Sequence, residues 1–169
     1  MTKRKIFLVR DKIEAGTVLQ TELRIRDFEV DEFVFDPDGA YEVLSREKGD
    51  SLVVVNSMLV GKLKGDNRRY TDQNTFGFLQ TGVTLLRDLS KSNPGKFPQH
   101  SMMYTISDQK NRSYQGVKMF CDKFDIPLIE GYNLWCLYSF GEAVERRYTE
   151  LFGSREQPAE QSSERSSAE

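Results

Sequence analysis

Short apolar runs alternate with stretches of helical periodicity in the second half of this chain, and this alternation most constrains the fold. The runs at 52–55, 102–106 and 126–129 are rich in Leu, Ile, Val and Met, whereas the apolar residues between them recur at helical spacing. Strands that are separated by helices in this way usually lie side by side in a parallel sheet. The C-terminal half therefore predicts a partly parallel sheet with helices packed on its faces.

The helices of this half have recognisable start and stop signals. The first is expected from Thr71 or Asp72, both natural N-caps, to the turn residues at 92–95. The second is expected over 108–124, and a capping box at Ser139 opens the last helix.

The first third of the chain is β-rich and predicts antiparallel strands. Residues 6–9 (IFLV) predict a strand, Gly16 a turn, and 23–35 (LRIRDFEVDEFVF) a second strand, because apolar and charged residues alternate there. The segment 36–39 (DPDG) is a strong turn signal. The chain thus predicts an α/β fold, with a β-rich N-terminal third followed by alternating strands and helices on a mixed, partly parallel sheet.

Composition predicts one globular domain over 1–153 and a disordered polar tail over 154–169. A chain of 169 residues with 38% hydrophobic residues can bury one core. The tail has no large apolar residue, and its two Arg and four Glu account for the net charge of −2. A neutral body argues against an extended basic coat for nucleic acid but allows a local basic groove.

The same composition predicts a cytoplasmic protein without membrane spans. No apolar run approaches ~20 residues, the length that a spanning helix needs. Cys121 and Cys136 lack the spacing of a zinc site or a disulfide framework, and His100 is the only histidine. Neither a P-loop nor a dinucleotide-binding glycine motif occurs.

The segment that follows the 102–106 strand resembles part of a known family. After Thr105 come a helix and the form I-x-L-I-x-G-x-x-L, which is similar to the closing βαβ portion of restriction-endonuclease-like domains, the PD-(D/E)XK fold, and in particular of their Mrr-type branch. The resemblance implies a restriction-endonuclease-like fold and a nucleic-acid partner. The matching residues are Thr105, Ile126, Leu128, Ile129, Gly131 and Leu134.

In that family two carboxylates hold Mg²⁺ and a lysine serves the attacking water. The resemblance implies Asp38 as the first metal ligand, Asp108 or Glu47 as the second acid, and Lys110 or Lys62 as the lysine. The 52–60 strand departs from the family pattern, since Asn56 stands where an acid is expected. The hypothesis therefore covers both a Mg²⁺-dependent nuclease and a catalytically degenerate relative.

A basic loop supports contact with DNA or RNA. Basic side chains beside an aromatic residue are suited to phosphate contact and base stacking. Lys110 and Arg112 would extend the same groove. The loop residues concerned are Lys62, Lys64, Arg68, Arg69 and Tyr70.

Two other interpretations remain open. One is a non-enzymatic protein-interaction module, an adaptor of phage or mobile-element type, that engages a protein partner through the acidic tail and the aromatics Tyr132 and Trp135. The other is a small-ligand-binding doubly wound domain. The sequence leaves the oligomeric state undetermined.

Overall fold

A five-stranded parallel sheet forms the centre of the computed structural model, which describes residues 4–11, 16–59, 69–71, 73–105, 110, 112–130 and 137–153. The strand order is β2-β1-β3-β4-β5, the flavodoxin-like doubly wound order. All four neighbouring pairs are parallel. The strands are β1 (Arg4–Arg10), β2 (Phe28–Val34), β3 (Ser51–Asn56), β4 (Ser101–Thr105) and β5 (Leu128–Glu130).

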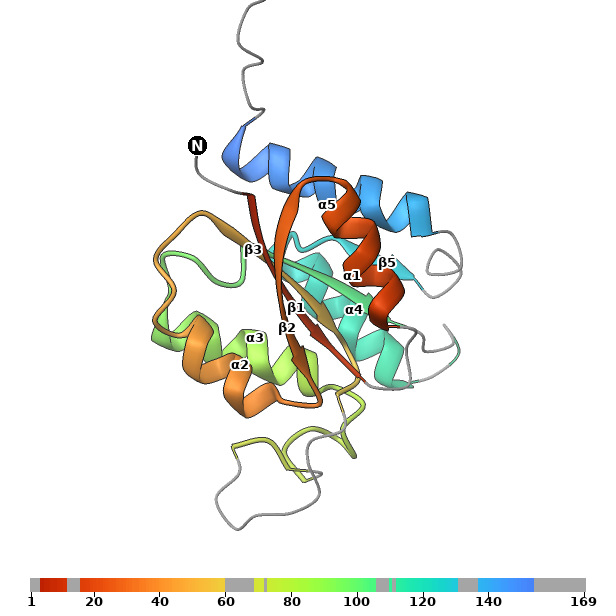
Figure 1. Ribbon diagram of the computed structural model, residues 1–169. Helices are drawn as coiled ribbons and strands as arrows, with labels where there is room; N and C mark the ends of the chain where they lie inside the picture. The colour runs from red at the N-terminus through yellow and green to blue at the C-terminus, as the bar shows by residue number, and fades with distance from the viewer. Residues whose placement is uncertain are drawn as a thin grey trace, which may run out of the picture.

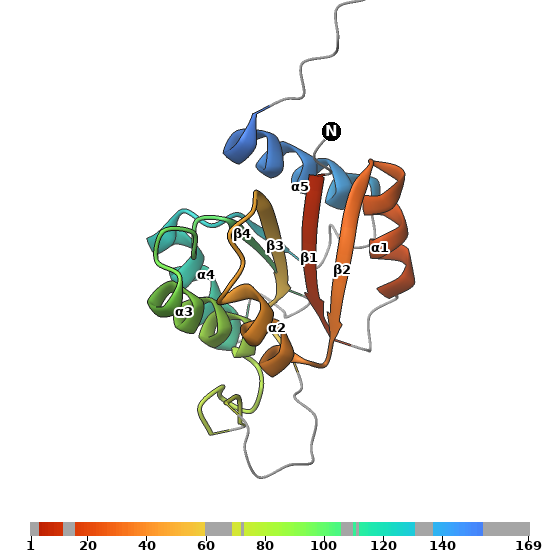
Figure 2. The same cartoon turned by 60° about the vertical axis from the view of Figure 1, so that its left-hand side comes forward.

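Helices cover both faces of this sheet (Figures 1 and 2). One face packs against α1 (Gly16–Ile25) and α5 (Leu137–Phe152). The other packs against α2 (Pro37–Leu44), α3 (Thr81–Ser92) and α4 (Arg112–Phe124).

The central strand β3 is buried on both faces, as its uncharged sequence predicts. Successive side chains of a strand point to opposite faces. Val53 and Val55 accordingly join the apolar cluster under α2, α3 and α4, whereas Leu52 and Val54 join the cluster under α1 and α5. All four side chains are fully buried.

The prediction of a mixed sheet with an antiparallel N-terminal third was wrong. The region expected to be one strand over 23–35 contains the end of helix α1, a turn at Asp27 (φ 61°) and strand β2. Leu19 and Leu23, four residues apart, are buried against the sheet, while Ile25 is exposed. The charged and apolar residues of 23–26 thus follow a helical period, and the helix carries the chain back so that β2 lies parallel to β1.

The C-terminal half follows the predicted alternation of strands and helices. Boundaries differ at α3 and α5. Helix α3 begins at Thr81 instead of Thr71 or Asp72, because residues 73–80 form consecutive turns. Helix α5 begins at Leu137, so Ser139 lies inside the helix and does not cap it. The predicted tail over 154–169 lies outside the described residues. Within the described part of the chain, no helix has the length and apolarity to cross a membrane.

His100 lies at the amino end of the sheet, against the last turn of α5. Its ring meets the Phe152 ring edge-on, with the centroids 5.1 Å apart. Burial lowers the pKa of His100, Lys96 and Arg147 lower it further, and Asp50 acts in the opposite direction. The folded protein therefore favours the neutral imidazole.

Acidification is expected to destabilise the protein through His100. The pKa of His100 in the folded state lies below the unfolded value of about 6.5, so the unfolded chain takes up the proton first. The stabilisation is present above about pH 6.5 and is lost as the pH falls through the folded pKa. Urea unfolding between pH 8 and pH 5 should show a larger drop in the midpoint for the wild type than for His100→Gln; parallel pH profiles would contradict this role.

Candidate functional site at the carboxyl edge of the sheet

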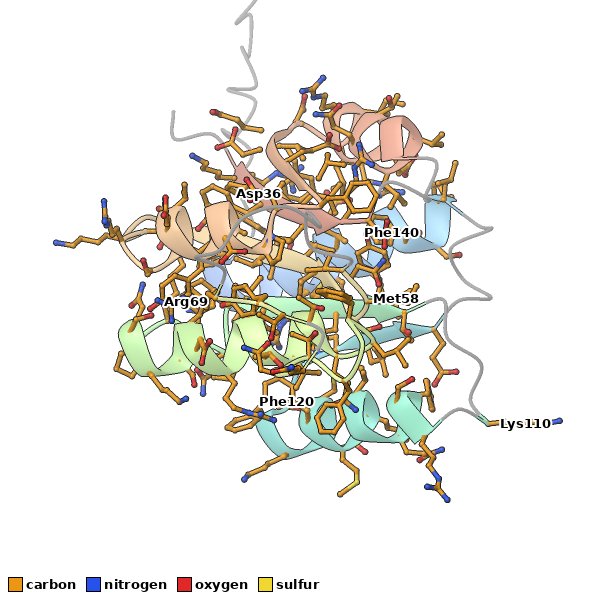
Figure 3. The ribbon with its side chains drawn as sticks, turned by 90° about the horizontal axis from the view of Figure 1, so that it is seen from below. Asp36, Met58, Arg69, Lys110, Phe120 and Phe140 are labelled. Atoms are coloured by element: carbon orange, nitrogen blue, oxygen red, sulfur yellow. The ribbon has the colours of Figure 1, made fainter. Side chains whose placement is uncertain are left out.

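The carboxyl ends of β1, β3 and β4 meet at one edge of the sheet, which Figure 3 shows from below. In doubly wound folds this edge holds the ligand crevice, at the point where the strand order reverses. Here that point lies between β1 and β3. The polar residues at these strand ends are Asp11, Asn56, Ser57 and Thr105, and all four are almost completely buried.

Polar groups at the ends of β3 and β4 bond to the chain itself. Ser57 Oγ donates to Thr105 Oγ1 over 2.8 Å, and the Ser57 N–H donates to the Tyr104 carbonyl over 2.9 Å. Asn56 Oδ1 accepts from the Met58 N–H at 3.1 Å. The two Ser57 bonds join the strand ends, whereas the Asn56 bond is local to the end of β3. All three use groups that an open crevice would offer to a ligand.

The first turn of α4 is tied to the same edge. The Tyr114 hydroxyl donates to Glu130 at the end of β5, and this bond is the main cause that raises the pKa of Tyr114 to about 12. Gln80 Nε2 donates to the Ser113 carbonyl over 3.4 Å. A Cβ at Gly116 would lie 2.3 Å from Gln80 Nε2, so the absence of a side chain lets Gln80 approach α4.

Helix α3 starts in direct contact with the end of β3. The Gly82 N–H donates to the Ser57 carbonyl over 3.0 Å, and Thr81 Oγ1 donates to the Leu59 carbonyl over 2.8 Å. A Cβ at Gly82 would lie 2.2 Å from the Asn56 carbonyl oxygen. Glycine is therefore required here by the close approach of two backbones.

The long connection between β3 and α3 is anchored on α2. The Arg69 N–H donates to Asp38 Oδ1 over 2.8 Å, and the Arg69 guanidinium lies 3.7 Å from the centroid of the Tyr41 ring. The next side chain, Tyr70, is fully buried in the core, and burial raises its pKa. Its hydroxyl has no hydrogen-bond partner in the described part of the chain. Tyr70 thus fixes the connection through its ring.

A strained turn follows this anchor and presents Phe76 to solvent. Phe76, Gly77 and Phe78 all have left-handed backbone conformations, with φ of 53°, 66° and 66°. This conformation costs about 1–2 kcal/mol for a residue with a side chain. Hydrogen bonds hold it: the Phe78 N–H donates to Thr75 Oγ1 over 3.1 Å, and the Thr81 hydroxyl shares its one proton between the Leu59 carbonyl and the Phe78 carbonyl, which lies 3.0 Å from Thr81 Oγ1. Phe76 remains 71% exposed.

The structure does not bring the predicted acids Asp38 and Glu47 together. Asp38 lies in the first turn of α2, near the carboxyl edge, and accepts from the Arg69 N–H. Glu47 follows the C-terminal end of α2 and lies 4.0 Å from Lys96 Nζ. The eight residues of α2 span about 12 Å, so the two carboxylates are on opposite ends of the helix. A shared magnesium ion does not fit this arrangement.

The other predicted metal ligand, Asp108, lies outside the described residues, so its pairing with Asp38 stays a prediction. Lys110 is exposed just before α4. Where the structure describes the chain, no three His, Cys, Asp or Glu residues gather into a metal-binding group.

The predicted nucleic-acid contacts are distributed unevenly. Arg69, Lys110 and Arg112 are exposed, and Figure 3 shows Arg69 and Lys110 on opposite sides of the molecule. The Tyr70 ring is buried, so it is not placed to stack on a base; this corrects the expectation of an exposed aromatic. The remaining predicted contacts, Lys62, Lys64 and Arg68, lie outside the described residues.

The sequence does not predict the exposure of Phe76, because the helix expected from Thr71 or Asp72 to 92–95 would include it as one of its apolar residues. The neighbouring Gly77 was the available signal, because glycine inside a helical pattern often marks a turn. Comparison with known proteins does not identify a family or a function for this site. No family model matches the chain, and no curated protein matches it significantly.

Proposed function

We propose that this protein is a non-enzymatic protein-interaction module and that Phe76 anchors its partner at the carboxyl edge of the sheet. The observation that carries the proposal is the exposure of Phe76 on a turn held in left-handed conformations. Local strain of this kind persists where the surrounding structure enforces it, and such positions cluster at functional sites. Buried aromatic anchors supply much of the affinity of protein interfaces.

The buried contacts at the ends of β3 and β4 support a binding role over catalysis. Ser57 and Thr105 are hydrogen-bonded to each other, and the Asn56 side chain caps the Met58 N–H. These groups are already hydrogen-bonded within the chain. They lie at the carboxyl edge of the sheet, where a doubly wound enzyme has an open crevice for its ligand. Partner recognition then relies on the surface outside the crevice, where Phe76 lies.

The stability of Phe76 variants should separate a binding role from a structural one. Phe76→Gly removes a ring that is 71% exposed and relieves a left-handed conformation. The relief of about 1–2 kcal/mol outweighs the added flexibility of the unfolded chain, about 0.4–1 kcal/mol. Urea unfolding should show an unchanged or slightly higher free energy of unfolding. A loss above about 1 kcal/mol would mean that Phe76 is there for stability.

Binding should respond in the opposite way. A partner captured by the wild-type protein, then purified and titrated by calorimetry, should bind Phe76→Ser at least about thirtyfold more weakly, the loss typical of an interface hot spot. Ile25→Ser is the matched control, since Ile25 is 74% exposed at the amino end of the sheet. Equal affinities for wild type and Phe76→Ser, or no partner that depends on Phe76, would overturn the proposal.

A second candidate is single-stranded nucleic acid bound at the same edge, by a degenerate or active relative of restriction-endonuclease-like domains. It is supported by the exposure of Arg69, Lys110 and Arg112, with Phe76 available for stacking. Because Arg69 and Lys110 lie on opposite sides of the molecule, the strand would have to cross the carboxyl edge to contact both. Replacing the three basic residues by Ala should lower the slope of log affinity against log salt by about 0.7 per lost phosphate contact. Mg²⁺-dependent cleavage of a labelled strand would identify a nuclease. Absence of binding at about 50 mM salt would exclude this candidate.

A further inference from the structure

Helices α3 and α4 lie side by side on one face of the sheet (Figures 2 and 3). On α4, four residues at intervals of four, three and four positions share one side of the helix. This side is turned toward α3, because its Gly116 is the residue that Gln80, at the start of α3, approaches. The four residues are Arg112, Gly116, Met119 and Lys123.

Helix α3 adds a cation, Arg87, to the region between the two helices. The next residue, Asp88, lies on the α2 side of α3, near Tyr70: burial raises the pKa of Tyr70, and Asp88 raises it further. Arg87 and Asp88 are about 100° apart round the helix axis. Since Leu86 and Leu89 point into the core, Arg87 lies on the other flank, toward α4, and it is exposed.

The carboxylates of these two helices are turned away from this region. Helix α3 has Asp88, which pairs with Lys91 over 3.4 Å on the α2 side. Helix α4 has Asp122, which pairs with Lys118 over 3.5 Å on the flank away from α3. Within α3 and α4, both described over their whole length, the facing flanks therefore carry positive charge alone.

An apolar side chain lies among these cations. Arg87 and Arg112 form no ion pair in the described part of the chain, and Lys123 Nζ lies 5.4 Å from the centroid of the Phe124 ring. Met119, between Arg112 and Lys123 on α4, is 71% exposed. Methionine adapts its shape to apolar partners and is common at protein-binding surfaces. The α3–α4 surface is defined here as Arg87, Arg112, Met119 and Lys123.

We propose that the partner of this protein presents an acidic amphipathic α-helix, which lies along the α3–α4 surface. The apolar side of such a helix contacts Met119, and its carboxylates contact the cations on either side. The stretch from Arg112 to Lys123 is about 16 Å long, which is about three turns of a helix. A single-stranded nucleic acid fits this surface less well, because Met119 offers no ring on which a base can stack.

The inference rests on the proposed protein-interaction role and names the chemistry of the partner. Phe76 lies four residues before Gln80, the N-cap of α3, and Gln80 in turn meets Gly116 on α4. The turn that presents Phe76 therefore adjoins the carboxyl-edge end of the α3–α4 surface.

A synthetic acidic helix tests the proposal. The probe is Glu-Leu-Glu-Glu-Leu-Leu-Glu written twice, acetylated and amidated, whose leucines recur at helical spacing. Calorimetry at about 50 mM salt should show at least about tenfold tighter binding than for the same peptide with Lys in place of Glu. Proline at the fourth position of each repeat breaks the helix and should weaken binding at least about tenfold. Equal affinities of the acidic and basic peptides, or full affinity of the proline peptide, would overturn the proposal.

Charge reversal on the α3–α4 surface gives a second readout. The surface variant should bind the acidic peptide at least about tenfold more weakly than the wild type does, and the basic peptide more tightly. The gain in affinity for the basic peptide separates a changed surface from a misfolded protein. The surface variant combines Arg87→Glu, Arg112→Glu and Lys123→Glu.

A control variant makes the same change in net charge at exposed positions elsewhere. Its affinity for both peptides should stay within about threefold of the wild type, because charges beyond about 10 Å are screened. Similar affinities of the surface and control variants would overturn the proposal. The control variant combines Arg24→Glu, Arg46→Glu and Lys48→Glu.

The captured partner separates this inference from the proposed function. If the partner lost affinity for Phe76→Ser but bound the surface variant like the wild type, the acidic helix would be wrong and the role of Phe76 would stand. Loss with the surface variant alone would support the acidic helix and overturn the role of Phe76. Oligothymidylate that bound more tightly than the acidic peptide, and lost affinity with the surface variant, would assign the surface to nucleic acid instead.

Discussion

Leu86→Ala should lower the free energy of unfolding by about 2–5 kcal/mol. Leu86 lies in the middle of α3 and is fully buried in the cluster between the sheet and α2, α3 and α4. Removal of its side chain loses apolar burial and leaves a cavity that a packed core closes only in part. Urea unfolding should show a lower midpoint with an unchanged slope, because the surface exposed on unfolding is the same.

Arg87→Ala is the matched control for this prediction. Arg87 is the next residue on the same helix and is exposed. Its replacement should change the free energy of unfolding by no more than about 0.5 kcal/mol. If Leu86→Ala and Arg87→Ala had equal stabilities, the buried face of α3 would be assigned wrongly.

Gly82→Ala should destabilise the protein by on the order of 1–3 kcal/mol, although alanine is the better helix former. The added Cβ would lie 2.2 Å from the Asn56 carbonyl oxygen, a backbone atom that cannot rotate away. The start of α3 would have to withdraw from the end of β3, which disturbs the bonds from Gly82 to Ser57 and from Thr81 to Leu59.

The control for Gly82 is Gly95→Ala, since a Cβ at Gly95 meets no atom within 4 Å. Gly95→Ala should leave the stability nearly unchanged or raise it by up to about 1 kcal/mol, because alanine restricts the unfolded chain. Amide exchange of Ser57 and Thr105 should accelerate in Gly82→Ala alone. Equal effects of the two substitutions would show that the contact between α3 and β3 is not close.

The sequence predicted the elements of the C-terminal half because their patterns are local. The buried run over 52–55 contains no charge, and the helices α4 and α5 show apolar spacing with start and stop signals. It misassigned 23–26, where alternation of charged and apolar residues fits both a strand and an amphipathic helix over so short a stretch. The choice was made by tertiary structure: β2 lies parallel to β1, and a parallel pair needs a crossover, here through α1.

The candidate site depended on contacts between residues far apart in the sequence. From the sequence, Asp38 and Glu47 were expected to share a metal ion, and Tyr70 was expected to stack on a base. The sequence did not show that α2 separates the two acids or that the Tyr70 ring is buried. The sequence by itself determined an α/β chain with a buried central strand, because hydrophobic periodicity is a local property. The direction of the strands, the closure of Ser57 on Thr105 and the exposure of Phe76 were decided by tertiary structure alone, since each depends on which distant backbone lies beside it.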